Sequence, residues 1–149
     1  MSAAHETAIR SYLEANNRLD FEGIGAIFAD AAVQEWPGSG EVTHGRAAIL
    51  AVARATPTLP RTHLDRIRSD GALTIAECAA DYGDGKTWQV CSVFEFAAEQ
   101  VVRKTDYFVA GSEAPEWRRA MTDVLRWPEA DQPHRTIHNL RIVLLFPTT

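Results

Sequence analysis

The sequence predicts an α+β fold in which helices pack on one face of a curved, mainly antiparallel sheet. Apolar side chains in roughly the first 55 residues recur mainly at helical spacing. From Thr62 the period changes to alternation, which is typical of half-buried strands. Asp-Gly pairs at 70–71 and 84–85 separate the alternating runs, and this dipeptide favours tight hairpin turns. Helices followed by a run of strands indicate an α+β layer design.

Three helices are expected before the long strands. The first covers residues 4–18. Its apolar stripe consists of Ala8, Ile9, Tyr12, Leu13 and Ala15. Asp20 can cap a second, short helix, because its carboxylate can accept from the N–H groups of the first turn, and this helix is expected to close at Asp30. The third helix covers residues 46–55 and ends at the proline-containing segment 56–60.

Five strands are expected, one of them short. The short strand is the alternating run AAVQEW at 31–36, between the second and third helices. The four long strands are residues 62–69, 73–82, 86–97 and 100–108. A short loop at Ala98 and Glu99 joins the last two as a hairpin. The strand 86–97 is rich in aromatic and β-branched residues, which suit a half-buried sheet.

Composition and charge indicate an ordinary globular domain. The chain has 149 residues, of which 46% are hydrophobic and 23% charged, so it fits one domain with a sizeable core. The net charge is −5 and the 15 Lys and Arg residues are scattered, so we expect no nucleic-acid partner. No apolar run approaches the ~20 residues needed to span a bilayer, and the N-terminus lacks the pattern of a secretory signal. We therefore expect a cytoplasmic protein without a membrane partner.

The two cysteines, Cys78 and Cys91, fall in the middle of predicted strands and lack the spacing of metal ligands. A buried thiol behaves there as a small apolar residue. Together with the missing signal, these two thiols indicate a reducing compartment. No Gly-rich loop follows a strand to hold a phosphate. We expect no metal and no organic cofactor.

The predicted domain covers residues 1–126. A helix is expected to start near Pro115 and to continue to about Leu125, because proline favours the first turn of a helix. Residues 127–149 are expected to form a C-terminal extension of uncertain structure. Its apolar run NLRIVLLF, residues 139–146, is an extra strand, an interface element or a tail, and we expect it to be covered because an unpaired apolar strand invites aggregation.

Asp106 is a carboxylate that the sequence places in an apolar setting. It opens the segment Asp106-Tyr107-Phe108 at the end of the last long strand. If it points into the fold, its ionised form needs partners, because an unpaired buried charge is very costly. Such a carboxylate is a candidate acid or base. The alternative is an edge aspartate that faces water. Strict alternation puts Asp106 on one face with Lys104 and Val102.

A second carboxylate, Asp81, shares a face with Glu77 by the same alternation. If these faces enclose a cavity, it is largely apolar with few polar groups, as small-molecule pockets are. Lys104 is then a partner for one of the carboxylates, and the alternative is a solvated lysine outside the strand. His63 lies by position near the mouth of such a pocket. It is a further acid–base candidate, because histidine titrates near neutral pH.

Residues expected to bind a substrate lie mainly on the last two long strands. They are Trp36, Trp88, Val90, Ser92, Phe94, Lys104 and Phe108. Tyr12 lies on the apolar stripe of the first helix. It is either a core residue or a hydrogen-bond donor to a bound ligand.

Three segments of the chain resemble the SnoaL-like branch of the NTF2-like superfamily. They are YLEANNRLDFEGIGAIFADAAVQEWPGSG, the following GRAAIL, and KTDYF followed by APEWR. The resemblance covers roughly residues 6–119. It implies a cone-shaped α+β barrel, usually dimeric, with a ligand cavity between the first helix and the curved sheet. Relatives include polyketide cyclases, ketosteroid isomerases, epoxide hydrolases and proteins without a catalytic role, so the fold alone does not fix the reaction.

The resemblance to ketosteroid isomerases implies roles for three residues. Tyr12 takes the place of the tyrosine that donates to the developing oxyanion in those enzymes. Trp36 stands where they carry their base aspartate, and Ser92 stands near their second acid. Two of three parts are therefore missing, and isomerisation by that machinery is not expected.

The other relatives point to the two aspartates. Asp81 and Asp106 match the two acids of limonene-type epoxide hydrolases, but Ala79 replaces the arginine of that triad. SnoaL-type cyclases rely on one aspartate as acid or base in an aldol-type ring closure, and Asp106 is the best match. We therefore predict Asp106 as the principal acid–base residue with Tyr12 as its partner, and Asp81 or His63 as alternatives.

Two functions from different classes remain open. The first is a cofactor-free acid–base enzyme of cyclase, isomerase or hydrolase type, acting on a hydrophobic small molecule in an enclosed pocket. The second is a non-catalytic ligand-binding or dimerisation module whose polar residues satisfy the core. A homodimer through the outer face of the sheet is expected from the resemblance and from apolar residues such as Cys91 and Val93.

Overall fold

The computed structural model describes residues 2–86 and 88–123. The described helices are α1 (Ser2–Arg18), α2 (Phe21–Ala26), α3 (Arg46–Ala55) and α4 (Glu116–Arg119). The described strands are β1 (Phe28–Trp36), β2 (Glu41–His44), β3 (Arg61–Asp70), β4 (Leu73–Asp81), β5 (Trp88–Ala97) and β6 (Gln100–Ala110). The predictions for the C-terminal extension, including the domain end at 126 and the apolar run 139–146, lie outside the described residues.

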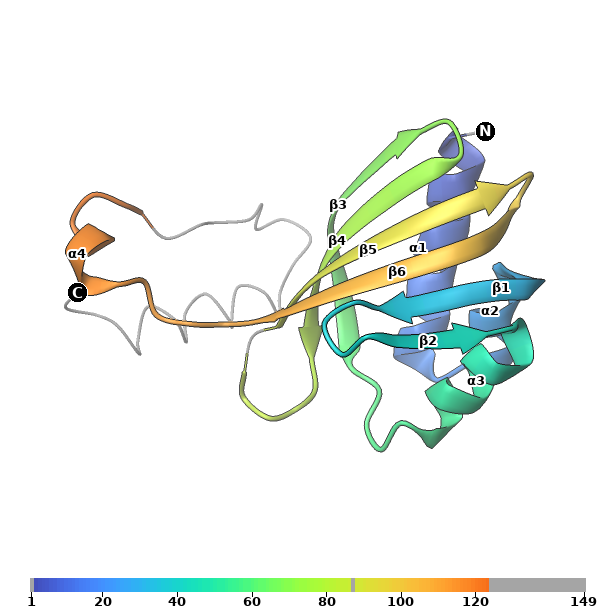
Figure 1. The fold of residues 1–149 in the computed structure, drawn as a ribbon, viewed down its shortest axis with the longest axis horizontal. Coiled ribbons are helices and arrows are strands. Elements are labelled where there is room, and N and C mark those ends of the chain that lie inside the picture. The colour runs from blue at the N-terminus through green and yellow to red at the C-terminus, as the bar shows by residue number, and fades with distance from the viewer. Residues whose placement is uncertain (1, 87, 124–149) are drawn as a thin grey trace.

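The six strands form one curved sheet in the order β2-β1-β6-β5-β4-β3. Neighbouring strands are antiparallel, except that β1 and β6 pair in parallel. Figure 1 shows α1 crossing one face of the sheet, with α2 and α3 beside β1 and β2. The edge strands β2 and β3 do not meet, so the sheet stays open. The predicted α+β fold class is confirmed, with an open curved sheet in place of a closed barrel.

Two predicted boundaries near the first strand are wrong, and one further strand was not predicted. β1 begins at Phe28, so the second helix ends at Ala26 and Asp30 belongs to the strand. The strand β2, residues Glu41–His44, was not expected, because four residues are too few to show a clear alternation. It pairs with β1 as a hairpin whose loop is formed by residues 37–40.

The helix expected from Pro115 to about Leu125 is also shorter than predicted. In the described part of the chain, α4 ends at Arg119, and none of its residues is buried. A short helix without a buried face gains little from packing, and packing supplies most of the stability of protein helices. The helix that starts after Pro115 therefore stays short, because it has no buried face to stabilise further turns.

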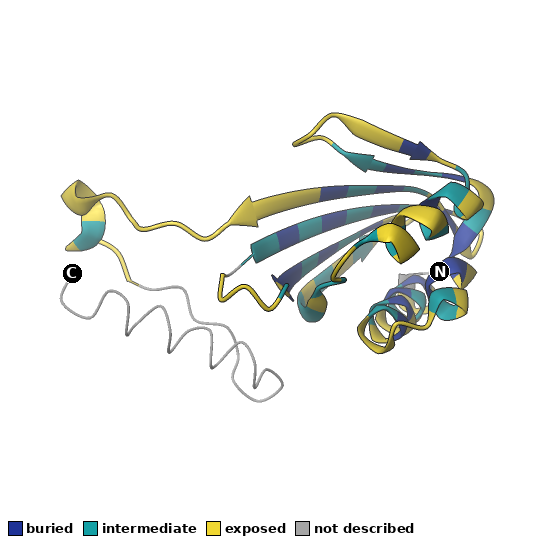
Figure 2. Cartoon of the chain, turned by 90° about the horizontal axis from the view of Figure 1, so that it is seen from below, coloured by how far each residue is buried: buried dark blue, intermediate teal, exposed yellow. Residues whose placement is uncertain are grey.

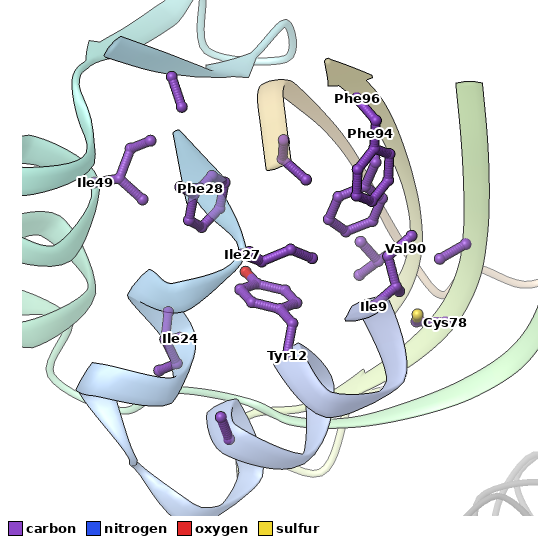
Figure 3. Packing of buried hydrophobic residues seen from close by; sticks show 14 of the residues in the cluster. Ile9, Tyr12, Ile24, Ile27, Phe28, Ile49, Cys78, Val90, Phe94 and Phe96 are labelled. Carbon is purple, nitrogen blue, oxygen red and sulfur yellow. The ribbon is translucent and has the colours of Figure 1, made fainter. Parts of the chain in front are cut away.

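The core lies between α1 and the inner face of the sheet (Figure 3). Ile9 of α1, Phe28 of β1 and Phe94 of β5 are almost fully buried there. Tyr12 packs edge-on against both phenylalanines, with ring centroids 5.8 Å from Phe28 and 6.0 Å from Phe94. Figure 2 shows buried and half-buried residues alternating along the middle strands, whereas the far end of β6 is exposed. The core therefore anchors α1 directly over the middle of the sheet.

An irregularity in β6 sets which of its residues point inward. Val101 pairs with Phe96 and Arg103 pairs with Glu95, so Val102 is an extra residue without an opposite partner. Val102 is exposed, whereas Lys104 is buried. The prediction that Val102 shares a face with Lys104 and Asp106 is therefore wrong, because a bulge shifts the alternation by one residue.

Removing the cap of α2 is expected to destabilise the fold. The Asp20 carboxylate accepts a hydrogen bond from the backbone N–H of Gly23 at 3.0 Å, as predicted for an N-cap residue. Asp20→Ala is expected to lower the free energy of unfolding by about 1 kcal/mol, the typical effect of losing a cap. Denaturant titration measures this change. Asp20→Asn keeps the acceptor and serves as the control, so equal losses in the two variants would contradict the capping role.

Candidate functional site

An inner cavity of about 160 Å³ lies between the helices and the inner face of the sheet. Side chains of α1, α2 and α3 form one wall, and side chains of β1, β4, β5 and β6 form the other. The predicted site residues that line it are Tyr12, Trp36, Val90, Ser92, Lys104, Asp106 and Phe108. The structure thus brings Asp106 and Tyr12, the predicted catalytic pair, to one cavity.

Sheet register gathers four polar residues on the strand wall of this cavity. Lys104 and Asp106 are two residues apart on β6, so both point inward. Ser92 lies directly opposite Asp106 on β5, and Gln34 lies opposite Lys104 on β1. All four are buried. We call Gln34, Ser92, Lys104 and Asp106 the Asp106 cluster.

The carboxylate of Asp106 accepts four short hydrogen bonds within this cluster. Its Oδ1 accepts from Lys104 Nζ at 2.7 Å and from Ser92 Oγ at 2.6 Å. Its Oδ2 accepts from Lys104 Nζ at 2.6 Å and from Gln34 Nε2 at 2.9 Å. Two bonds to each oxygen match the capacity of an ionised carboxylate. The arrangement is that of a carboxylate facing an ammonium group.

Lys104 and Asp106 form a buried ion pair. Only 7% of the Lys104 side chain and 2% of the Asp106 side chain are exposed. The two alternatives left open by the sequence, a solvated lysine and an edge aspartate in water, therefore do not hold. Burial by itself would lower the pKa of Lys104, but the charge of Asp106, with Tyr12 and their hydrogen bonds, raises it above its ordinary value. Lys104 is accordingly charged at neutral pH.

Tyr12 approaches this ion pair from α1. The Lys104 ammonium lies 5.4 Å from the centre of its ring. Burial raises the pKa of Tyr12, and the nearby Lys104 opposes this only in part. The phenol therefore keeps its proton at neutral pH and can act as a donor.

Two of the four predicted catalytic residues do not join the cavity. Asp81 is exposed at the end of β4, where its carboxylate accepts from the backbone N–H of Gly83 at 2.7 Å. Cys78 and Ala80 of the same strand line the cavity, so alternation turns Asp81 to the other side. His63 of β3 lines a separate groove between α1 and β3.

Two predicted substrate-binding residues also lie outside the cavity wall. Phe94 is buried beneath the site, with the Lys104 ammonium 5.5 Å from its ring centre. Trp88 sits at the mouth, where its ring meets Tyr82 edge-on at 6.0 Å. Phe94 therefore supports the site from below, and Trp88 lies at its entrance.

Gln34 is the residue of the Asp106 cluster that the sequence reading missed. It lies on the predicted strand AAVQEW, on the face that also carries Ala32 and Trp36. A polar residue between two apolar ones on the inner face was the available signal. The signal was weak, because the other face of the same strand carries Val33 and so is not clearly polar.

The cavity opens into a wider outer basin of about 660 Å³. The residues shared by the cavity and the basin are Trp36, Val52, Thr56, Tyr82, Asp106 and Phe108. The basin is also lined by Trp88, Glu41 and Asp84, which do not line the cavity. The Asp106 cluster is thus reached from solvent through a largely aromatic mouth.

Within residues 2–86 and 88–123, no three His, Cys, Asp or Glu side chains lie close enough together to hold a metal ion. None of the helices in that part of the chain is both long and apolar enough to cross a membrane. Burial raises the pKa of the Cys78 thiol to about 12, so this cavity-lining residue is a neutral thiol. The polar chemistry of the cavity wall therefore comes mainly from Tyr12 and the Asp106 cluster.

Comparison with known proteins places this geometry in a family. The model of the SnoaL-like domain matches residues 9–104. A solved NTF-2 like protein of unknown function from Burkholderia xenovorans is 30% identical, with a TM-score of 0.77. The match covers 83% of this chain and 97% of that one. No curated protein matches the sequence.

Two further solved structures share the fold. A Kribbella flavida protein described as a candidate ketosteroid isomerase has a TM-score of 0.76 at 22% identity, covering 87% of this chain and 95% of its own. An LEH-like epoxide hydrolase of M. tuberculosis has a TM-score of 0.64 at 25% identity, covering 72% and 80%. The resemblance predicted from the sequence is confirmed, and the neighbours span more than one chemistry.

Proposed function

The chain belongs to the SnoaL-like domain family, and we propose that it is a cofactor-independent acid–base enzyme acting on a small hydrophobic substrate in the inner cavity. One observation carries the proposal. A buried Lys104–Asp106 ion pair and the Tyr12 hydroxyl face the same largely apolar cavity. Perturbed ionisable groups gathered in an apolar pocket make that pocket a candidate functional site.

The arrangement suits proton abstraction next to a carbonyl group. Asp106 takes the proton from the α-carbon, and the electron pair of the broken C–H bond forms an enolate on the substrate. The negative charge develops on the carbonyl oxygen, where Tyr12 and the charge of Lys104 stabilise it. Return of the proton from Asp106 to a different carbon completes an isomerase-type reaction. Attack of the enolate carbon on a second carbonyl forms an alkoxide, which takes the proton from Asp106 and so completes a cyclase-type reaction.

A particular step must precede this chemistry. All four acceptor positions of Asp106 are occupied, so either the Ser92 hydroxyl or the Gln34 amide must turn away before a proton can bind. Both are neutral donors, so their bonds to the carboxylate lack the opposite charge that strengthens the two bonds from Lys104. The first movement on substrate binding is therefore expected in Ser92 or Gln34.

The same saturation favours a second candidate function. A carboxylate whose acceptor positions are all filled also fits a ligand-binding module, in which the Asp106 cluster only satisfies a polar wall. In this case the cavity would bind a small molecule without changing it. The predicted homodimer, through the outer face where Cys91 and Val93 are half-buried, is compatible with both functions and stays a prediction.

Hydrogen–deuterium exchange separates the two functions. In D₂O, proton NMR follows the loss of the α-hydrogens of two simple ketones, cyclohexanone and decalone. An acid–base enzyme is expected to accelerate the exchange of a bound ketone well above the rate in buffer, even if that ketone is not its natural substrate. A ketone that binds in the cavity but exchanges at the buffer rate would favour the binding module.

A further inference from the structure

The size, charge and hydrogen-bonding groups of the inner cavity restrict what it can hold. We infer that its ligand is a neutral carbonyl compound of about one ring, with its oxygen directed at Tyr12. The inference rests on the proposed function, because both concern the same cavity, and it names the substrate class. Three independent features carry it.

The first feature is size. The cavity measures about 160 Å³, close to the ~150 Å³ of an engineered protein cavity that binds benzene. A single six-membered ring therefore fills it. Its walls include Ile24, Ile49 and Cys78, which are at most 3% exposed and packed in the core. Because packed walls resist added volume, a fused second ring does not fit in the cavity.

The second feature is charge. Among the described residues that line the cavity, only Lys104 and Asp106 are charged, and they neutralise each other at 2.6 Å. A ligand charge of either sign would therefore be buried without a counter-charge, which is very unfavourable. The outer basin adds Glu41 and Asp84, and these acidic groups also repel anions. The cavity therefore selects a neutral ring.

The third feature is the unused donor. The Lys104 ammonium lies 5.4 Å from the centre of the Tyr12 ring and has donors but no acceptor, so it cannot receive the proton of the phenol. Tyr12 is left with its own proton, and in the described part of the chain no acceptor receives it. A carbonyl oxygen is the complementary group. A hydrocarbon of the same size would fill the cavity but leave this donor unpaired.

The outer basin explains where the rest of a longer ligand would go. Trp36, Tyr82 and Phe108 line both the cavity and the basin. An apolar substituent on the ring would therefore pass between aromatic side chains on its way to solvent. The volume of the cavity therefore limits the size of the ring, whereas a substituent that extends into the basin is not limited by it.

Ligand titration of the full chain by NMR tests the inference with four probes of known chemistry. Cyclohexanone is expected to bind at least about 10-fold more tightly than methylcyclohexane, which lacks the oxygen, and than cyclohexanecarboxylate, which is anionic. Decalone, with two fused rings, is expected to bind at least about 10-fold more weakly than cyclohexanone. Each tenfold step is easily resolved by titration.

Two tyrosine variants locate the oxygen. Tyr12→Phe is expected to weaken cyclohexanone binding about 10-fold and to leave methylcyclohexane binding unchanged, because only the ketone uses the hydroxyl. Tyr107→Phe makes the same chemical change at an exposed position that lines neither the cavity nor the basin, and it is expected to leave both affinities unchanged.

The possible results separate this inference from the proposed function. Decalone or the carboxylate binding as tightly as cyclohexanone overturns the inference, and so does equal loss of affinity in the two tyrosine variants. If decalone binds and its α-hydrogens exchange, the inference fails and the proposed function stands. If cyclohexanone binds selectively through Tyr12 without exchange, the ligand class stands and the enzymatic function fails.

Discussion

Replacing Lys104 with methionine is expected to lower the free energy of unfolding by about 3–5 kcal/mol, the range found when one partner of a buried ion pair is removed. The reason is the isolation of Asp106. Its carboxylate is 2% exposed, and without Lys104 it keeps only the neutral donors Ser92 and Gln34. Methionine preserves most of the volume of the lysine stem, so packing contributes little to the change. Urea titration of the purified chain measures the loss.

A neighbouring residue provides the matched control. Arg103 precedes Lys104 on β6 and pairs with Glu35 at 2.6 Å, but its side chain is 43% exposed. Arg103→Met therefore removes two partly exposed ion pairs, with Glu35 and with Glu95, and its unfolding curve is expected to stay close to that of the wild type. Equal losses from Arg103→Met and Lys104→Met would show that burial of the Lys104–Asp106 pair does not matter.

The double variant Lys104→Met/Asp106→Asn tests the cause directly. It removes both charges, while the asparagine oxygen can still accept from Ser92. The double variant is expected to be more stable than Lys104→Met alone, because no unpaired charge remains. If the double variant loses as much free energy of unfolding as Lys104→Met and Asp106→Asn lose together, the energies of Lys104 and Asp106 are not coupled.

The layer order of the fold could be read from periodicity, and the third helix, residues 46–55, was predicted with the bounds that α3 has. The errors arose where a local pattern was short or interrupted. The strand β2 is four residues long, and the bulge at Val102 reverses the alternation next to the site. Periodicity describes a run of residues, so it cannot locate a single inserted one.

The candidate site, like the fold, was predicted only in part from the sequence. Lys104 and Asp106 are neighbours on one strand, so alternation was enough to place them on one face. Gln34 reaches them only because β1 and β6 pair in parallel, although they are 70 residues apart (Gln34↔Lys104). Such a pairing depends on the global topology, and parallel neighbours leave no turn signal in the sequence. The resemblance to a family suggested Tyr12, but it did not predict that the Lys104 ammonium would lie beside the ring of Tyr12.

The structure also changes how Asp106 must be tested. Asparagine has nearly the same size as aspartate, so Asp106→Asn keeps the packing of this side chain. In the structure this substitution leaves the Lys104 ammonium buried without its counter-charge. A loss of activity in the single variant could then come from a loss of fold. The double variant Lys104→Met/Asp106→Asn avoids this problem.

Asp106→Asn is expected to reduce the rate of ketone exchange by at least ~100-fold, the low end for a lost acid–base group. The double variant is expected to show the same loss, because it lacks the carboxylate but carries no unpaired charge. NMR titration with cyclohexanone measures whether each variant still binds, so that lost turnover is separated from lost binding. Circular dichroism of the same samples confirms that they are folded.

Asp81 offers the matched carboxylate. Asp81→Asn makes the identical chemical change at an exposed strand end, where the asparagine oxygen can still accept from the Gly83 N–H. Its exchange rate is expected to equal that of the wild type, because Asp81 does not line the cavity. A folded Lys104→Met/Asp106→Asn protein with normal exchange would remove Asp106 from the mechanism. A loss in Asp81→Asn alone would move the base to the end of β4.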